Sequence, residues 1–139
     1  MNNNKSLVPT WVRIVVGLLA LANIAFGVSN YFSAAALFQN NSVGVDLMSA
    51  AAKYASYEFG ARNLAIGLAL LIVASVGVPE TIAIMTIVRA LVEVQSAVIG
   101  IISGNFGVGT MISIVVFAVE VFIIVTMFRI VGERDHKNA

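Results

Sequence analysis

Cysteine is absent from this chain of 139 residues, and charged side chains make up only 11% of it. Without cysteine there are no disulfides, thiolate nucleophiles, iron–sulfur clusters or dithiol reactions. The single histidine, His136, lies in the polar tail GERDHKNA. We therefore expect no metal or haem site among the apolar segments, and the sequence predicts no cofactor. The net charge is +1 without a long basic run, which argues against a nucleic-acid partner.

Hydrophobic residues, at 60% of the chain, are what the sequence has in abundance, and they indicate an integral membrane protein. A transmembrane helix needs about 20 mostly apolar residues to cross roughly 30 Å of hydrocarbon. The short connections VGVPE and SGNFGVG make successive spans antiparallel. The predicted fold is an all-α membrane protein, an up-and-down four-transmembrane-helix bundle that forms one domain over residues 1–139. The expected spans are residues 11–32, 57–78, 81–102 and 106–131.

The distribution of lysine and arginine predicts the orientation of the bundle. Only Lys53 lies in the long connection 33–56. The basic residues that flank the spans on the opposite side are Lys5, Arg13, Arg129, Arg134 and Lys137. We therefore expect both termini to be cytoplasmic, in the inner membrane of a bacterium, with the long connection outside.

Two segments near the first two spans need a separate interpretation: residues 18–27 and the end of the long connection. The stretch LLALANIAFG (18–27) contains small residues that could precede a signal-peptide cut, although we favour a retained helix. In the long connection, Asp46 can cap a following helix that runs straight into the second span. The chain before the second span is therefore expected to be partly ordered.

Ionisable and amide side chains within the spans are expected to form two tiers, because about 1.5 Å of rise per residue places several of them at shared depths. The inner tier holds Arg89 and Glu120. The outer tier holds Arg62, Glu93, Asn23 and Asn63. Arg89 and Glu93, four residues apart, connect the tiers along one helix face. Polar residues expected to support the tiers are Arg13, Glu58, Gln95, Ser96 and Ser113.

The deep charges do not balance in number. Two arginines face three glutamates, so one carboxylate lacks a full partner unless another basic side chain reaches in. A low dielectric favours the neutral acid for such a carboxylate. Glu120 is the better candidate for a switchable proton, since Glu93 has both Arg62 and Arg89 within reach. The competing interpretation is a purely structural ion-pair network, whereas an intramembrane ionisable residue is by default a functional-site hypothesis.

The openings of the first two spans carry the pattern of a known family. The first span, WVRIVVGLLALANIAFGVSNYF, has an arginine at its cytoplasmic end and a glycine four residues later, and the second begins with YEFGARNLAIGLALL. This order of elements resembles the DoxX-like group of small four-helix bacterial membrane proteins. The positions that carry the resemblance are Arg13, Gly17, Glu58, Gly60 and Arg62.

The resemblance implies a range of roles: subunits of quinone-linked oxidoreductases, accessory proteins in oxidative-stress responses or, in animals, assembly chaperones for membrane receptors. Arg89, Glu93 and Glu120 match no motif shared by that group. A specific activity such as thiosulfate oxidation is therefore not implied, and the absence of cysteine removes the thiol chemistry of some redox roles.

We favour a binding or accessory protein whose buried arginines and glutamates line a polar pocket inside the bundle. Its partner beyond the lipid bilayer would be a lipophilic ligand, such as a quinone-like molecule or a lipid head group, or another membrane protein. The alternative is a proton-coupled small-molecule transporter. Small multidrug exporters also have four helices, but they carry a glutamate in the first helix where this sequence has Asn23.

Catalysis is not expected, because the estimated depths separate Glu93 and Glu120 by about 11 Å along the bundle normal. No catalytic residue is assigned. Homo-oligomerisation stays open, since the small residues Ala61, Ala65 and Ala69 share a stripe that suits close helix contacts, within the bundle or between copies.

Overall fold

Four long helices make up the computed structural model, which describes residues 8–33, 46, 48–102 and 107–138. Each helix is long and apolar enough to cross a membrane, so the predicted all-α fold with four membrane spans is confirmed. The helices are α1 (Thr10–Phe32), α3 (Ala50–Val76), α4 (Pro79–Ile102) and α5 (Val108–Asn138). Lys5 and most of the loop expected before the second span lie outside the described residues.

Local capping explains where α3 begins and ends. The helix starts seven residues before the expected span, because the Ser49 hydroxyl accepts a hydrogen bond from the Ala52 amide at 3.2 Å. Asp46 instead accepts the Met48 amide at 2.9 Å, one turn before the helix, so the expected cap was wrong but the continuous helix is confirmed. At the other end Gly77, with φ 72°, ends α3 in the left-handed conformation.

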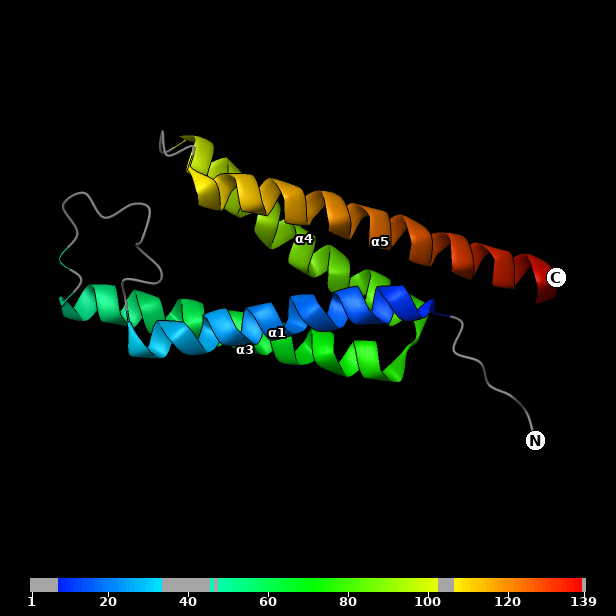
Figure 1. Ribbon diagram of the computed structural model, residues 1–139, viewed down its shortest axis with the longest axis horizontal. Coiled ribbons are helices and arrows are strands. Elements are labelled where there is room, and N and C mark those ends of the chain that lie inside the picture. The colour runs from blue at the N-terminus through cyan, green and yellow to red at the C-terminus, as the bar shows by residue number, and fades with distance from the viewer. Residues whose placement is uncertain (1–7, 34–45, 47, 103–106, 139) are drawn as a thin grey trace.

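The helices pack as two pairs, α1 against α3 and α4 against α5, and the pairs are joined chiefly through α3 and α4 (Figure 1). The start of α1, the turn between α3 and α4 and the end of α5 all lie toward one end of the molecule, here called the inner end (Figure 1). The pairs separate toward the opposite, outer end (Figure 1). The predicted up-and-down order is therefore present, with packing that is mainly pairwise.

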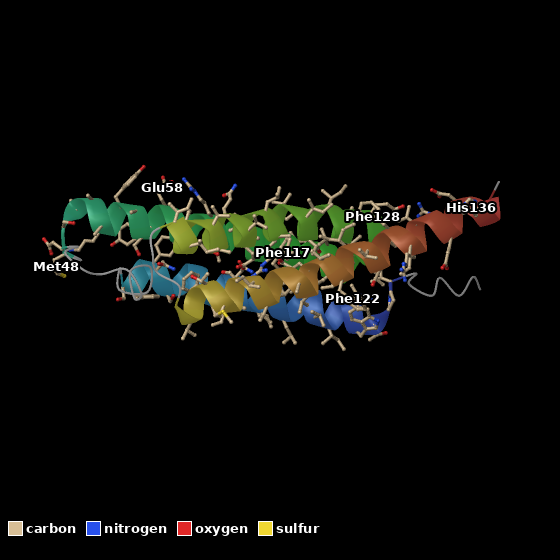
Figure 2. All side chains as sticks on the ribbon, turned by 90° about the horizontal axis from the view of Figure 1, so that it is seen from above. Met48, Glu58, Phe117, Phe122, Phe128 and His136 are labelled. Atoms are coloured by element: carbon tan, nitrogen blue, oxygen red, sulfur yellow. The ribbon has the colours of Figure 1, made fainter. Side chains whose placement is uncertain are left out.

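At the inner end all four helices share one apolar core. Trp11 of α1 packs there on Phe122 of α5, with ring centroids 5.6 Å apart, where Figure 2 shows α5 crossing α1. The burial of α4 ends at Ala90, so its outer half is covered only in part. The buried members of the core are Val8, Val12, Val16, Ala20, Leu70, Ala74, Ile82, Ala83, Ile123 and Met127.

Glycine makes the seam between α1 and α3 close. A Cβ atom on Gly27 would lie 2.7 Å from the Leu64 nitrogen and 2.9 Å from the Gly60 oxygen, both backbone atoms that cannot move aside. Gly67 meets the backbone of α1 in the same way. Close backbone approach is how helices gain contact area in lipid, where no hydrophobic force drives them together.

Gly27→Ala should therefore lower the free energy of unfolding by about 1–3 kcal/mol, because the added methyl group forces α1 and α3 apart. Gly17→Ala is the matched control, since nothing lies within 4 Å of a Cβ there, and it should leave stability unchanged or slightly higher. Unfolding in detergent, followed by circular dichroism, measures both. Equal behaviour of the two variants would contradict the close seam.

Candidate functional site

Arg89, on the buried face of α4, joins two carboxylates. Its Nη2 donates to Glu93 Oε1 at 2.9 Å, and its Nη1 donates to Glu120 Oε1 on α5. The side chains of Arg89, Glu93 and Glu120 are 8%, 16% and 0% exposed. We call these three residues the Arg89 triad. The predicted inner tier is thus present as a buried salt bridge between Arg89 and Glu120, and the predicted link from Arg89 to Glu93 is present too.

Helix geometry explains why these side chains meet. Arg89 and Glu93 are one turn apart on α4 and so share a face. Arg89 stands 13 residues before Ile102, and Glu120 stands 12 residues after Val108, so an antiparallel pair brings them to one level. Gly100 helps because it leaves room for Thr110 where α4 and α5 approach near their connection.

Two polar atoms of the triad have no hydrogen-bond partner within the described part of the chain. They are Arg89 Nε, a donor, and Glu120 Oε2, an acceptor, and both are fully buried. Buried polar groups are nearly always paired, because an unmade hydrogen bond costs about 1–3 kcal/mol. The triad therefore has hydrogen-bonding capacity that the described part of the chain leaves unused.

The predicted outer tier does not form, because Arg62 turns away from Glu93. Its Nη2 lies 3.3 Å from Glu58 Oε2 on its own helix, and its side chain is 75% exposed. The Tyr54 hydroxyl donates to the same carboxylate at 3.0 Å. Figure 2 shows Glu58 projecting outward from α3. The prediction failed because Glu58 offers a partner one turn away, whereas the outer halves of α3 and α4 diverge (Figure 1).

The amides expected in that tier are buried between α1 and α3 instead. Asn23 donates to the Leu19 carbonyl at 2.8 Å, and Asn63 donates to the Phe59 carbonyl at 2.9 Å, each within its own helix. A bond to the carbonyl one turn earlier gives each amide a partner within its own helix, so these asparagines do not form the expected tier with Arg62 and Glu93. These asparagines fill the seam rather than extend the triad.

Arg13 connects α1 to the end of α3. Its Nε donates to the Ala74 carbonyl at 2.9 Å, and its Nη2 donates to the Ser75 carbonyl at 3.0 Å. These carbonyls belong to the last turn of α3, where a cation is favourable because of the helix dipole. Arg13 therefore anchors the inner end and does not reach Glu120.

The remaining expected supporting residues make no hydrogen bond to the triad within the described chain. Gln95 and Ser96 are exposed, and Ser113 is half-buried. The spacing of Ser96 from Arg89 puts it on the same side of α4, but the buried positions of α4 end at Ala90. Shared helical spacing therefore does not ensure burial.

An ion pair that was not predicted from the sequence joins α4 to α5 at the inner end. Arg134, near the end of α5, pairs with Glu80 in the first turn of α4. Glu80 also lies at a helix N-terminus, where a negative charge is favourable. The available signal was an acid at the start of one helix and a base late in its antiparallel neighbour. It was missed because the expected fourth span ended at residue 131.

Other features of the described surface do not form a second site near the triad. One hollow is lined by residues from Gly107 to Val116 at the start of α5, and another by α3 residues from Tyr54 to Arg62; no residue of the triad lines either hollow. In the described residues, no group of three or more His, Cys, Asp or Glu is placed to hold a metal ion. The Arg89 triad is therefore the candidate functional site.

Comparisons with protein-family models, curated proteins and solved structures give no match. The DoxX-like resemblance therefore rests on the order of four helices and on positions in α1 and α3. In the structure, Arg13 and Gly60 hold those two helices together, and Glu58 pairs with Arg62 on the surface. None of these positions contacts the triad.

Replacing Arg89 by methionine should lower the free energy of unfolding by about 2–4 kcal/mol, because Glu120 then stays charged without a partner or must take up a proton. An average polar contact in a bilayer is worth only about 0.6 kcal/mol, so a loss of this size identifies the unpaired charge. The double variant Arg89→Met/Glu120→Met should recover most of the loss. Denaturant unfolding in micelles measures each variant.

The matched control is Arg62→Met, which removes an exposed arginine from a pair of the same i,i+4 spacing as Arg89 and Glu93. It should change the unfolding midpoint little, since exposed ion pairs contribute little. If Arg62→Met lowered the free energy of unfolding as much as Arg89→Met, burial would not explain the effect of the Arg89 substitution.

Proposed function

We propose that this protein is a binding or accessory protein of the membrane, in which the Arg89 triad holds the polar end of a lipophilic partner. The partner is a quinone-like molecule, a lipid head group or a polar side chain on a helix of another membrane protein. In this proposal the inner end faces the cytoplasm of a bacterial cell, in keeping with the distribution of basic residues.

The unused hydrogen-bonding capacity of the triad is the observation that carries the proposal. Arg89 Nε can donate and Glu120 Oε2 can accept, and both atoms are buried without a partner in the described chain. A carbonyl oxygen suits the first atom and a hydroxyl suits the second. Quinone-like compounds and lipid head groups offer such groups on an apolar body, which suits a site between apolar helices.

The arrangement of the helix pairs supports access to the triad from the outer side. The burial of α4 ends at Ala90, and Glu93 keeps 16% of its side chain exposed. Toward the outer end the α1–α3 pair and the α4–α5 pair separate (Figure 1). Glu93 is therefore the member of the triad that an approaching ligand would meet first, before the more deeply buried Arg89 and Glu120.

Gentle purification from the native membrane, followed by mass spectrometry, should identify a bound lipophilic molecule or a stoichiometric protein partner. Adding quinones or anionic lipids to delipidated protein should raise its unfolding temperature, because a ligand that binds only the folded state stabilises it. The rise should be lost in Glu93→Gln and retained in Glu58→Gln, whose carboxylate lies on the outer face of α3. Equal rises in both variants would place binding elsewhere.

A proton-coupled transporter is a second candidate, and the surplus carboxylate of the triad favours it. The first helix lacks the glutamate of small multidrug exporters and carries Asn23 there, hydrogen-bonded within its own helix. In proteoliposomes, transport would appear as flux of an organic cation driven by a pH gradient and lost in Glu120→Gln. Absence of flux in active binding preparations would leave the binding function alone.

A further inference from the structure

The Arg89 triad carries one negative charge more than positive charge if both carboxylates are ionised. Arg89 supplies the single guanidinium, and Glu93 and Glu120 supply two carboxylates, all at 16% exposure or less. The second oxygen of Glu120 is buried without a partner in the described chain. The surplus negative charge arises because both carboxylates bond to the same guanidinium.

Charged groups on the neighbouring helices do not correct the surplus. On α1, Arg13 is bonded to the carbonyls at the end of α3. On α3, Arg62 is paired with Glu58 on the outer face, and Lys53 is exposed near the outer end. At the inner end of α4 and α5, Glu80 pairs with Arg134, while Arg129 is exposed. In the described chain the triad therefore has Arg89 as its single cation.

We propose that the triad binds one proton at neutral pH, held jointly by Glu93 and Glu120, so that the site as a whole is neutral. An uncompensated ion in a low-dielectric interior costs several kcal/mol, and a single proton removes that cost. Both carboxylates bond to one guanidinium, so a second negative charge would have no matching cation in the site, and one shared proton removes that charge. Arg89 keeps its own proton, because a guanidinium is not deprotonated in proteins.

This inference deepens the proposed function, because it assigns a second ligand, the proton, to the same site. Glu120 Oε2 is the buried atom that can carry the proton, and the partly exposed Glu93 is the member through which it can exchange with the outside. A partner that donates a hydrogen bond to Glu120 Oε2 would compete with the proton there. Binding of that partner and release of the proton are then linked, each altering the affinity for the other.

Infrared spectroscopy of the purified, ligand-free protein at neutral pH tests the proposal through the carbonyl band of a protonated carboxyl group. Wild type should show the band of one such group. Glu120→Gln and Glu93→Gln should each abolish it, because the remaining carboxylate then balances Arg89 alone. Arg89→Gln should roughly double it, since two carboxylates are then left without a cation. Glu58→Gln, on the outer face of α3, should leave the band unchanged.

Absence of the band in wild type overturns the proposal. A band that persists in Glu93→Gln also overturns it, because Glu120 is then neutral through its own burial rather than through a shared charge balance. Circular dichroism checks folding, and if Glu120→Gln does not fold, Glu93→Gln decides the question. The infrared test uses ligand-free protein, so its result is independent of the binding test. If the band is present but quinones and lipids do not raise the unfolding temperature, the proposed binding function is wrong and the shared proton stands. If they raise it but the band is absent, the shared proton is wrong and the binding function stands.

Discussion

The guanidinium of Arg89 joins α4 to α5, because it bonds to a carboxylate on each of the two helices. An arginine in hydrocarbon is costly unless it is paired, so the side chain fixes α4 and α5 in the one register that brings Glu120 opposite it. The same group holds Glu93, one turn along. With that register set, Ile123 and Met127 of α5 lie in the apolar core at the inner end. The α4–α5 pair is thus specified by charge more than by close backbone contact.

The α1–α3 pair is specified by different means. Glycines permit close backbone contact along its seam, and the buried asparagines bond to carbonyls of their own helices. Arg13 adds bonds to the last carbonyls of α3 at the inner end. In the described chain, the buried side-chain atoms without a hydrogen-bond partner belong to α4 and α5. The α4–α5 pair differs, because Arg89 Nε and Glu120 Oε2 are buried there without a hydrogen-bond partner in the described chain. This contrast is why the candidate site belongs to the second pair.

Hydropathy and helical rise were sufficient to predict the four spans and the meeting of Arg89 with Glu120, because short connections leave antiparallel helices little freedom along the bundle axis. The same rise placed Arg62 and Glu93 at one depth, yet they do not meet. The depth of a residue in the bundle does not give the direction in which its side chain points around the helix axis, or how far two helices diverge. Arg62 also has an alternative partner, Glu58, one turn away on its own helix. The early start of α3 depended on a single hydroxyl, that of Ser49.

The contact of Arg13 with α3 has a consequence for how the chain assembles. Its partners, the carbonyls of Ala74 and Ser75, follow it by 61 and 62 positions. Synthesis runs from the N-terminus, so Arg13 cannot make these bonds until the last turn of α3 has been made. The Arg13 contact needs only α1 and α3, so it can form before α5 has been made, whereas the bond from Arg89 to Glu120 requires α5.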